Sequence, residues 1–156
     1  MALNRVVPYT TNDGINYLIK FSVFKAEVLP EQITLPVVEI IIETNSTHDN
    51  IYNDISTIKR LLHIVLEYIH ENDVVFYFYC NNKPIKKSEK NIHLSHQEFR
   101  SNLFSAMFQL DKTNRFTNKL VIINDQDGNH YIHLITKIEF EETANLIMEE
   151  LKKFDK

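Results

Sequence analysis

The chain has 156 residues, of which 44% are hydrophobic and 24% are charged, as expected for one globular domain with a single hydrophobic core. A domain of this size needs neither disulfides nor a structural metal for stability, so the composition implies no cofactor. The net charge of −4 and the pI near 6.0 oppose binding to nucleic acid mainly through phosphate contacts, which requires a surplus of Lys and Arg.

The first half of the chain predicts two strands, a third strand and a long helix. Residues 6–24 form a hairpin around Asp13-Gly14, with Tyr17, Ile19, Phe21 and Val23 on one face of its second strand. Residues 25–36 predict a loop or a short helical turn, and residues 37–44 a strand with Glu39 and Glu43 on its polar face. Apolar residues then recur at helical spacing from Ile51 to Ile69.

The second half begins with an apolar strand over residues 73–80, whose two apolar faces indicate a place inside a covered sheet. Ser95 and Glu98 have the spacing of a capping box and predict the start of a second helix. We expect that helix to bury Phe99, Leu103, Met107 and Leu110, with Phe104 and Phe108 widening the apolar face. A hairpin around Asp127-Gly128 and a final helix complete the chain.

The order of elements is therefore ββ β α β α ββ α. Hairpins without regular βαβ alternation favour an α+β fold, with a largely antiparallel sheet of about six strands and three helices packed on it. No repeat or linker divides residues 1–156, so we expect a single domain. The only two glycines belong to the hairpin turns, which excludes P-loop and dinucleotide-binding fingerprints because these need several glycines in close register.

Cys80 is the only cysteine and lies in an apolar strand, where it has no partner for a disulfide and fits a reducing compartment. The N-terminus lacks a secretory leader, and no stretch has the 18 or so apolar residues of a membrane span. The sequence therefore predicts a cytoplasmic protein that is not bound in a membrane.

Three patterns in the sequence are candidate sites of chemistry. Cys80, His93 and His96 provide zinc-binding atoms, but one ligand is missing; His130 and His133 point to opposite faces of a strand, so at most one could join them. Cys80 as a nucleophile is disfavoured because an apolar strand raises the pKa of a thiol. Glu39 and Glu43 share a strand face, which is more typical of a solvated sheet than of a nuclease metal site.

A local basic patch precedes and enters the second helix. Its residues are Lys83, Lys86, Lys87, Lys90, His93, His96 and Arg100. The patch could receive phosphate, RNA or an acidic partner, helped by the N-terminus of the helix, or it could be a loop that lysines keep solvated. The final helix is rich in glutamate, which stabilises the helix and could also face a basic partner.

The aromatic strand that ends at Tyr79 and Cys80 is followed by a polar loop and by a helix with the pattern Arg100-Ser-x-Leu103-Phe104-x-x-Met107-Phe108. Together with the preceding helix of the Ile55-x-x-Ile58 type, this arrangement resembles a bacterial family of small uncharacterised proteins over most of the chain. The resemblance implies a bacterial cytoplasmic setting and no particular activity.

No catalytic set emerges from the sequence, which favours a protein that is not an enzyme. The leading hypothesis is an interaction or regulatory module whose partner is another protein or a second copy of itself. The alternative is a small nucleic-acid-binding protein or nuclease that uses Lys86, Lys87, His93, His96 and Arg100 on phosphates. A homo-oligomer built through an uncovered sheet face or an edge strand is a third possibility.

Overall fold

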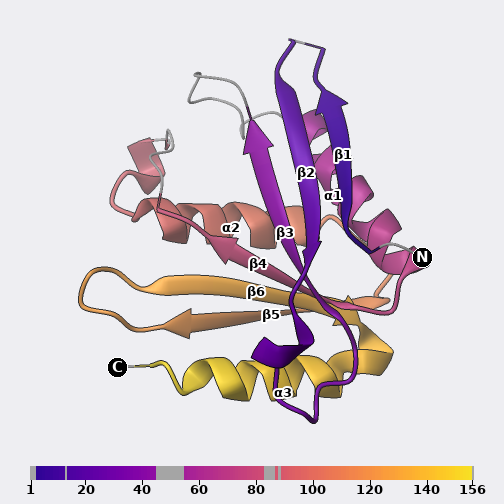
Figure 1. The fold of residues 1–156 in the computed structure, drawn as a ribbon. Helices are drawn as coiled ribbons and strands as arrows, with labels where there is room; N and C mark the ends of the chain where they lie inside the picture. The colour runs from indigo at the N-terminus through magenta and orange to yellow at the C-terminus, as the bar shows by residue number, and fades with distance from the viewer. Residues whose placement is uncertain (1–2, 13, 45–54, 83–86, 88, 156) are drawn as a thin grey trace.

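The structure, a computed structural model, describes residues 3–12, 14–44, 55–82, 87 and 89–155 (Figure 1). Its strands are β1 (Arg5–Thr10), β2 (Asn16–Val23), β3 (Val37–Thr44), β4 (Val75–Cys80), β5 (Phe116–Ile123) and β6 (His130–Lys137). Its α-helices are α1 (Ile55–Glu71), α2 (His96–Phe108) and α3 (Glu141–Lys152), and its 3-10 helices are η1 (Ala26–Val28), η2 (Glu89–Asn91) and η3 (Ile138–Phe140). The order ββ β α β α ββ α is as predicted.

The described strands form one sheet in the order β1-β2-β3-β4-β6-β5. Neighbours pair antiparallel except β3 and β4, which pair parallel. This arrangement confirms the predicted α+β class with a largely antiparallel sheet. It also places β4 in the interior of the sheet, between β3 and β6, as the apolar character of both its faces predicted.

Both hairpins turn at a glycine with a positive φ. Gly14 has a φ of 84° and Gly128 a φ of 120°, a region of backbone conformation that residues with a Cβ rarely adopt. Gly128 is also close to α2, because a Cβ there would lie 3.0 Å from Nε2 of Gln97. That nitrogen donates a hydrogen bond to the carbonyl of Asn129 over 3.2 Å, so the second hairpin is tied to the first turn of α2.

Helix α1 supplies much of the core on one face of the sheet. Its side chains Leu61, Val65 and Ile69 are at most 2% exposed, following the helical spacing in the sequence. Tyr68 stacks on Phe21 of β2 with ring centroids 4.1 Å apart. The predicted stripe also includes Ile51, which lies outside the described residues.

Helix α2 packs on the same face, and its N-terminus is capped as predicted. The hydroxyl of Ser95 accepts a hydrogen bond from the backbone N–H of Glu98 over 3.2 Å, which satisfies one of the free donors at the helix start. The buried side of α2 differs in part from the prediction. Leu103 and Leu110 are only partly buried, and Ser101 is buried, because a polar residue of β6 provides it with a hydrogen-bond partner.

Helix α3 covers the opposite face of the sheet, where it packs on β5 and β6 (Figure 1). Ala144 and Ile147 of this helix lie against Val121, Ile132 and Leu134 in a second hydrophobic core. We call the two faces of the sheet the α1/α2 face and the α3 face. In the described part of the chain, no helix is long and apolar enough to cross a membrane.

Candidate functional site

The α3 face of the sheet is covered over only part of its extent. On β2, Tyr17, Ile19 and Phe21 are at most 2% exposed on the α1/α2 face, whereas Leu18 on the other face is 39% exposed. In Figure 1, α1 lies behind β1, α2 passes behind β3, and α3 lies below these strands. We define the open face as the exposed or partly buried residues Val6, Pro8, Leu18, Lys20, Glu39, Ile41, Glu43, Tyr77 and Tyr79.

The open face includes the place where β3 and β4 part from each other. Their ladder has three pairs, which end at Glu39 opposite Tyr77. Beyond this pair β3 continues to Thr44 and β4 to Cys80, and the two strands diverge (Figure 1). Beyond the ladder, the peptide groups on the facing sides of these described segments do not pair with each other. They can therefore donate hydrogen bonds to a bound chain or accept them from it.

Glu39 lies on the last pair of this ladder and is partly buried. Burial raises the pKa of its carboxyl group. Burial also raises the pKa of the neighbouring Tyr77 to about 12, with further contributions from Glu39 and Tyr79. The ring of Phe24 packs edge-on against Tyr77 at 5.1 Å. Among the described residues, none forms a hydrogen bond or an ion pair with the Glu39 carboxylate.

A chain of three polar side chains borders the open face. The hydroxyl of Tyr79 lies 2.6 Å from Nδ1 of His130, and Nε2 of His130 lies 3.0 Å from the carboxylate of Asp125. Because a carboxylate only accepts hydrogen bonds, Nε2 carries a proton, and in the neutral imidazole Nδ1 accepts from Tyr79. Tyr79 is 37% exposed. The hydrogen bonds therefore hold an accessible tyrosine ring in a fixed orientation.

The predicted basic patch is only partly within the described residues, since Lys83 and Lys86 lie outside them. Lys87 donates to the carbonyl of Leu94, and Arg100 donates to the carbonyl of Asn81 over 2.9 Å. Arg100 therefore ties the end of β4 to α2, and Lys87 is bonded to a residue just before the helix cap. The remaining residues of the patch are Lys90 and His93, which are exposed, and His96, which is partly buried.

Cys80 is 1% exposed, and burial raises the pKa of its thiol to about 12, which agrees with its predicted place in the core. His130 and His133 lie on opposite faces of β6, as the alternation of a strand requires. Within the described ranges, no group of three or more His, Cys, Asp and Glu side chains is arranged to hold a metal ion.

The structure also assembles a buried polar cluster that the sequence did not predict. Nε2 of His133 lies 2.8 Å from the hydroxyl of Ser101, and Nδ1 of His133 lies 3.0 Å from Oδ1 of Asn118. Because the amide oxygen of Asn118 accepts, Nδ1 carries the proton and Ser101 donates to Nε2. Burial lowers the pKa of His133 to about 4.

The Ser101, His133 and Asn118 cluster has the order of groups found in nucleophilic hydrolases. Ser101 is 1% exposed and His133 is 0% exposed, so a substrate cannot reach the hydroxyl. We interpret the cluster as a structural network that joins α2, β5 and β6. One sequence signal could have revealed it, because His133 is a polar side chain between the apolar neighbours Ile132 and Leu134.

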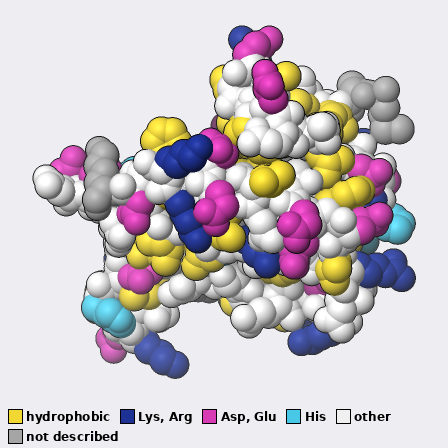
Figure 2. Space-filling view, turned by 90° about the horizontal axis from the view of Figure 1, so that it is seen from below, with side chains coloured by type: hydrophobic (Ala, Val, Ile, Leu, Met, Phe, Trp, Pro, Cys, Tyr) yellow, Lys and Arg dark blue, Asp and Glu magenta, His cyan; other side chains and the backbone are white. Residues whose placement is uncertain are grey.

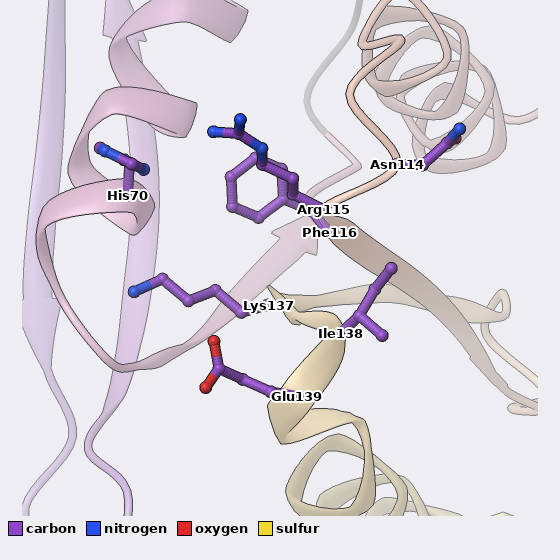
Figure 3. Close-up of a pocket in the computed structure, with 7 residues that line it drawn as sticks. All are labelled: His70, Asn114, Arg115, Phe116, Lys137, Ile138 and Glu139. Atoms are coloured by element: carbon purple, nitrogen blue, oxygen red, sulfur yellow. The ribbon is translucent and has the colours of Figure 1, made fainter.

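A shallow pocket of about 380 Å³ lies where β5 begins and β6 ends (Figure 3). It is lined by His70, Asn114, Arg115, Phe116, Lys137, Ile138 and Glu139. Lys137 is paired with Asp73 over 2.7 Å, and Glu139 points toward Lys137 in Figure 3. The charge of Lys137 in this pocket is therefore balanced by Asp73, which makes the pocket a weaker candidate than the open face.

The glutamate-rich α3 also carries little unbalanced charge on its surface. Glu141 pairs with Lys119 over 3.5 Å, Glu149 with Lys152 over 3.9 Å and Glu150 with Lys153 over 2.8 Å. Figure 2 shows the molecule from below, with acidic, basic and hydrophobic side chains interspersed. This view shows no large patch of a single charge.

Comparison of the chain with protein-family models, with curated proteins and with solved structures found no match.

Proposed function

We propose that this chain is a non-enzymatic protein-interaction module whose open face binds a basic, extended segment of a partner protein. The observation that carries the proposal is Glu39, whose partly buried carboxylate lies beside Tyr77 without a counter-charge among the described residues. Removing a carboxylate from water is unfavourable unless a cation accompanies it. A lysine or arginine side chain of the partner supplies that cation.

The charges of the neighbouring residues support this choice of partner. Lys20 pairs with Glu43 over 2.9 Å on the open face, so these two charges balance each other. Glu39 then leaves the open face with a net negative charge. Electrostatic complementarity of this kind determines which partners bind and how fast they associate.

The tyrosines of the open face suit the same partner. Tyr77 and Tyr79 follow each other on one face of β4, and Tyr79 is held by His130. Tyrosine is enriched at the centres of protein interfaces, and its ring attracts lysine and arginine cations. The diverging strands β3 and β4 add main-chain groups that an extended segment can use.

The burial of two nucleophilic side chains supports a role without catalysis. Cys80 and Ser101 are each 1% exposed, so neither is accessible to a substrate. A buried free thiol is stable in a reducing environment, and we place the module in the cytoplasm of a bacterial cell, the setting that the family resemblance implies.

The proposal can be tested with three labelled peptides in which threonine alternates with arginine, glutamine or glutamate. Fluorescence anisotropy measures their affinity, and amide chemical shifts map where they bind. We expect the arginine peptide to bind most tightly and to shift the amides of Glu39, Ile41 and Tyr79. Glu39→Gln should weaken its binding about tenfold, because the variant loses the partly buried charge.

Glu149→Gln is the matched control, because it removes an equal charge from the exposed surface of α3. Equal affinities for the three peptides, or equal losses in the two variants, would contradict the proposal. Binding of single-stranded RNA that is lost in Lys90→Ala would instead support the alternative function at the basic patch.

A further inference from the structure

The two edge strands of the sheet differ in how well they resist pairing with another strand. β1 carries Pro8 in its middle, and a proline on an edge strand blocks further pairing because it has no N–H group. β5 is eight residues long, and it contains neither proline nor glycine. It forms the opposite edge of the sheet, so it presents a continuous row of peptide groups.

The side chains of β5 also do little to prevent another strand from pairing with this edge. Leu120 is 43% exposed and Ile122 is 45% exposed, and both lie on the α1/α2 face of β5. Lys119 is the only charged residue of the strand, and it pairs with Glu141 at the start of α3. A long, apolar edge strand without a free charge readily adds another strand.

The polar and apolar residues of β5, together with Asn124 directly after the strand, have a self-complementary order on this face. Asn118, Leu120, Ile122 and Asn124 follow one another at alternate positions, so the pattern polar, apolar, apolar, polar reads the same in both directions. A strand with such a pattern matches an antiparallel copy of itself, because each apolar residue then faces an apolar residue.

We propose that β5 pairs antiparallel with β5 of a second copy, around a two-fold axis at Val121, to form a dimer with one continuous sheet. In this register Leu120 faces Ile122 of the second copy, and Asn118 faces Asn124 of the second copy. Lys119 faces Ile123 of the second copy, so the two lysines do not oppose each other. The contact area of one strand pair is small, and we expect a weak dimer that depends on protein concentration.

The proposal can be tested by sedimentation velocity over a concentration series, with hydrogen exchange of the β5 amides as a second measurement. We expect dimers of the wild-type chain and slower exchange along β5 as the dimer forms. The double variant Leu120→Lys with Ile122→Lys should weaken the dimer at least about tenfold, because like charges then face each other. Both positions are exposed, and circular dichroism verifies that the variant folds.

A complementary double variant, Leu120→Glu with Ile122→Glu, should also weaken self-association, and mixing it with the lysine variant should restore a dimer. Leu146→Lys is the matched control, because Leu146 is 41% exposed on α3; this variant should dimerise like the wild type. Glu39→Gln should also dimerise normally, which separates this proposal from the function of the open face.

A wild-type chain that stays monomeric throughout the series would overturn the proposal, as would a dimer that persists in the lysine variant. If the chain stays monomeric and an added, unrelated extended peptide protects the β5 amides, the edge binds a different chain and the self-pairing proposal is wrong.

Discussion

His130 and His133 lie three residues apart on β6, and the structure gives them opposite environments. His130 is hydrogen-bonded to Tyr79 and Asp125 at the surface. His133 is 0% exposed between Ser101 and Asn118. The strand alternation sends one side chain to each face of the sheet, so the same residue type orients an accessible tyrosine on one face and joins three elements on the other.

The buried His133 predicts a loss of stability in acid. Its pKa is lowered from 6.5 to about 4 in the folded chain, so below pH 6.5 the unfolded chain takes up a proton that the folded chain does not. The contribution of neutral His133 to the free energy of unfolding is fully present above pH 6.5. It is lost as the pH falls toward 4, by about 3 kcal/mol at most. Urea unfolding at several pH values measures this dependence.

Replacing His133 with glutamine should remove this part of the pH dependence, although the variant is less stable at every pH. His63→Gln on the exposed side of α1 serves as the control and should keep the dependence of the wild type. The same acid loss in His133→Gln would show that other groups cause it.

At the level of elements, α2 shows how local and tertiary information combine. The capping box located the N-terminus of the helix. Ser95 and Glu98 lie three residues apart, so the contact between the Ser95 hydroxyl and the Glu98 N–H needs no other part of the chain. The buried side of α2 was predicted less well. The helix has apolar residues on several sides, and its contact with β6 determined that Ser101 is buried and that Leu103 is only partly buried.

The cap makes a measurable contribution to α2. Ser95→Ala should lower the free energy of unfolding by about 1 kcal/mol, because the N–H of Glu98 loses its acceptor. Ser95→Asp should retain most of the stability, since a carboxylate also caps a helix. Denaturant unfolding followed by circular dichroism measures both variants, and an alanine variant as stable as the wild type would contradict the assigned cap.

In the whole molecule, helices cover both faces of the sheet where α3 packs on β5 and β6. The α3 face stays open over β1, β2 and β3. This difference separates the two proposals, because the open face carries the charge and the tyrosines while β5 carries the apolar edge. The part of the sheet around β4 is the interior of the molecule, and Cys80 lies there at 1% exposure.

Cys80 therefore reports on opening of the fold. A thiol reagent such as an aromatic disulfide should modify it slowly near pH 8, because the thiol is buried and burial raises its pKa to about 12. The reaction should accelerate strongly once urea unfolds the chain. Cys80→Ser combined with Asn82→Cys places the thiol on an exposed residue and should react at once; equally fast reaction of native Cys80 would contradict its burial.

The sequence alone determined the type and order of the elements. Periodicity, the two Asp-Gly turns and the Ser95 cap depend on neighbouring residues, so each can be recognised locally. The class followed from that order, and the place of β4 inside the sheet followed from the apolar character of both its faces. The predictions of a bacterial cytoplasmic setting, a partner and the role of the basic patch stay predictions.

The tertiary structure alone decided which residues meet and which face stays open. Glu39 belonged to a polar strand face in the sequence, and only the parallel ladder with β4 placed it beside Tyr77. The contact between Ser101 and His133 joins residues 32 positions apart, and the edge position of β5 follows from the strand order. Such features depend on contacts between distant segments, and the spacing of residues along a chain carries no information about them.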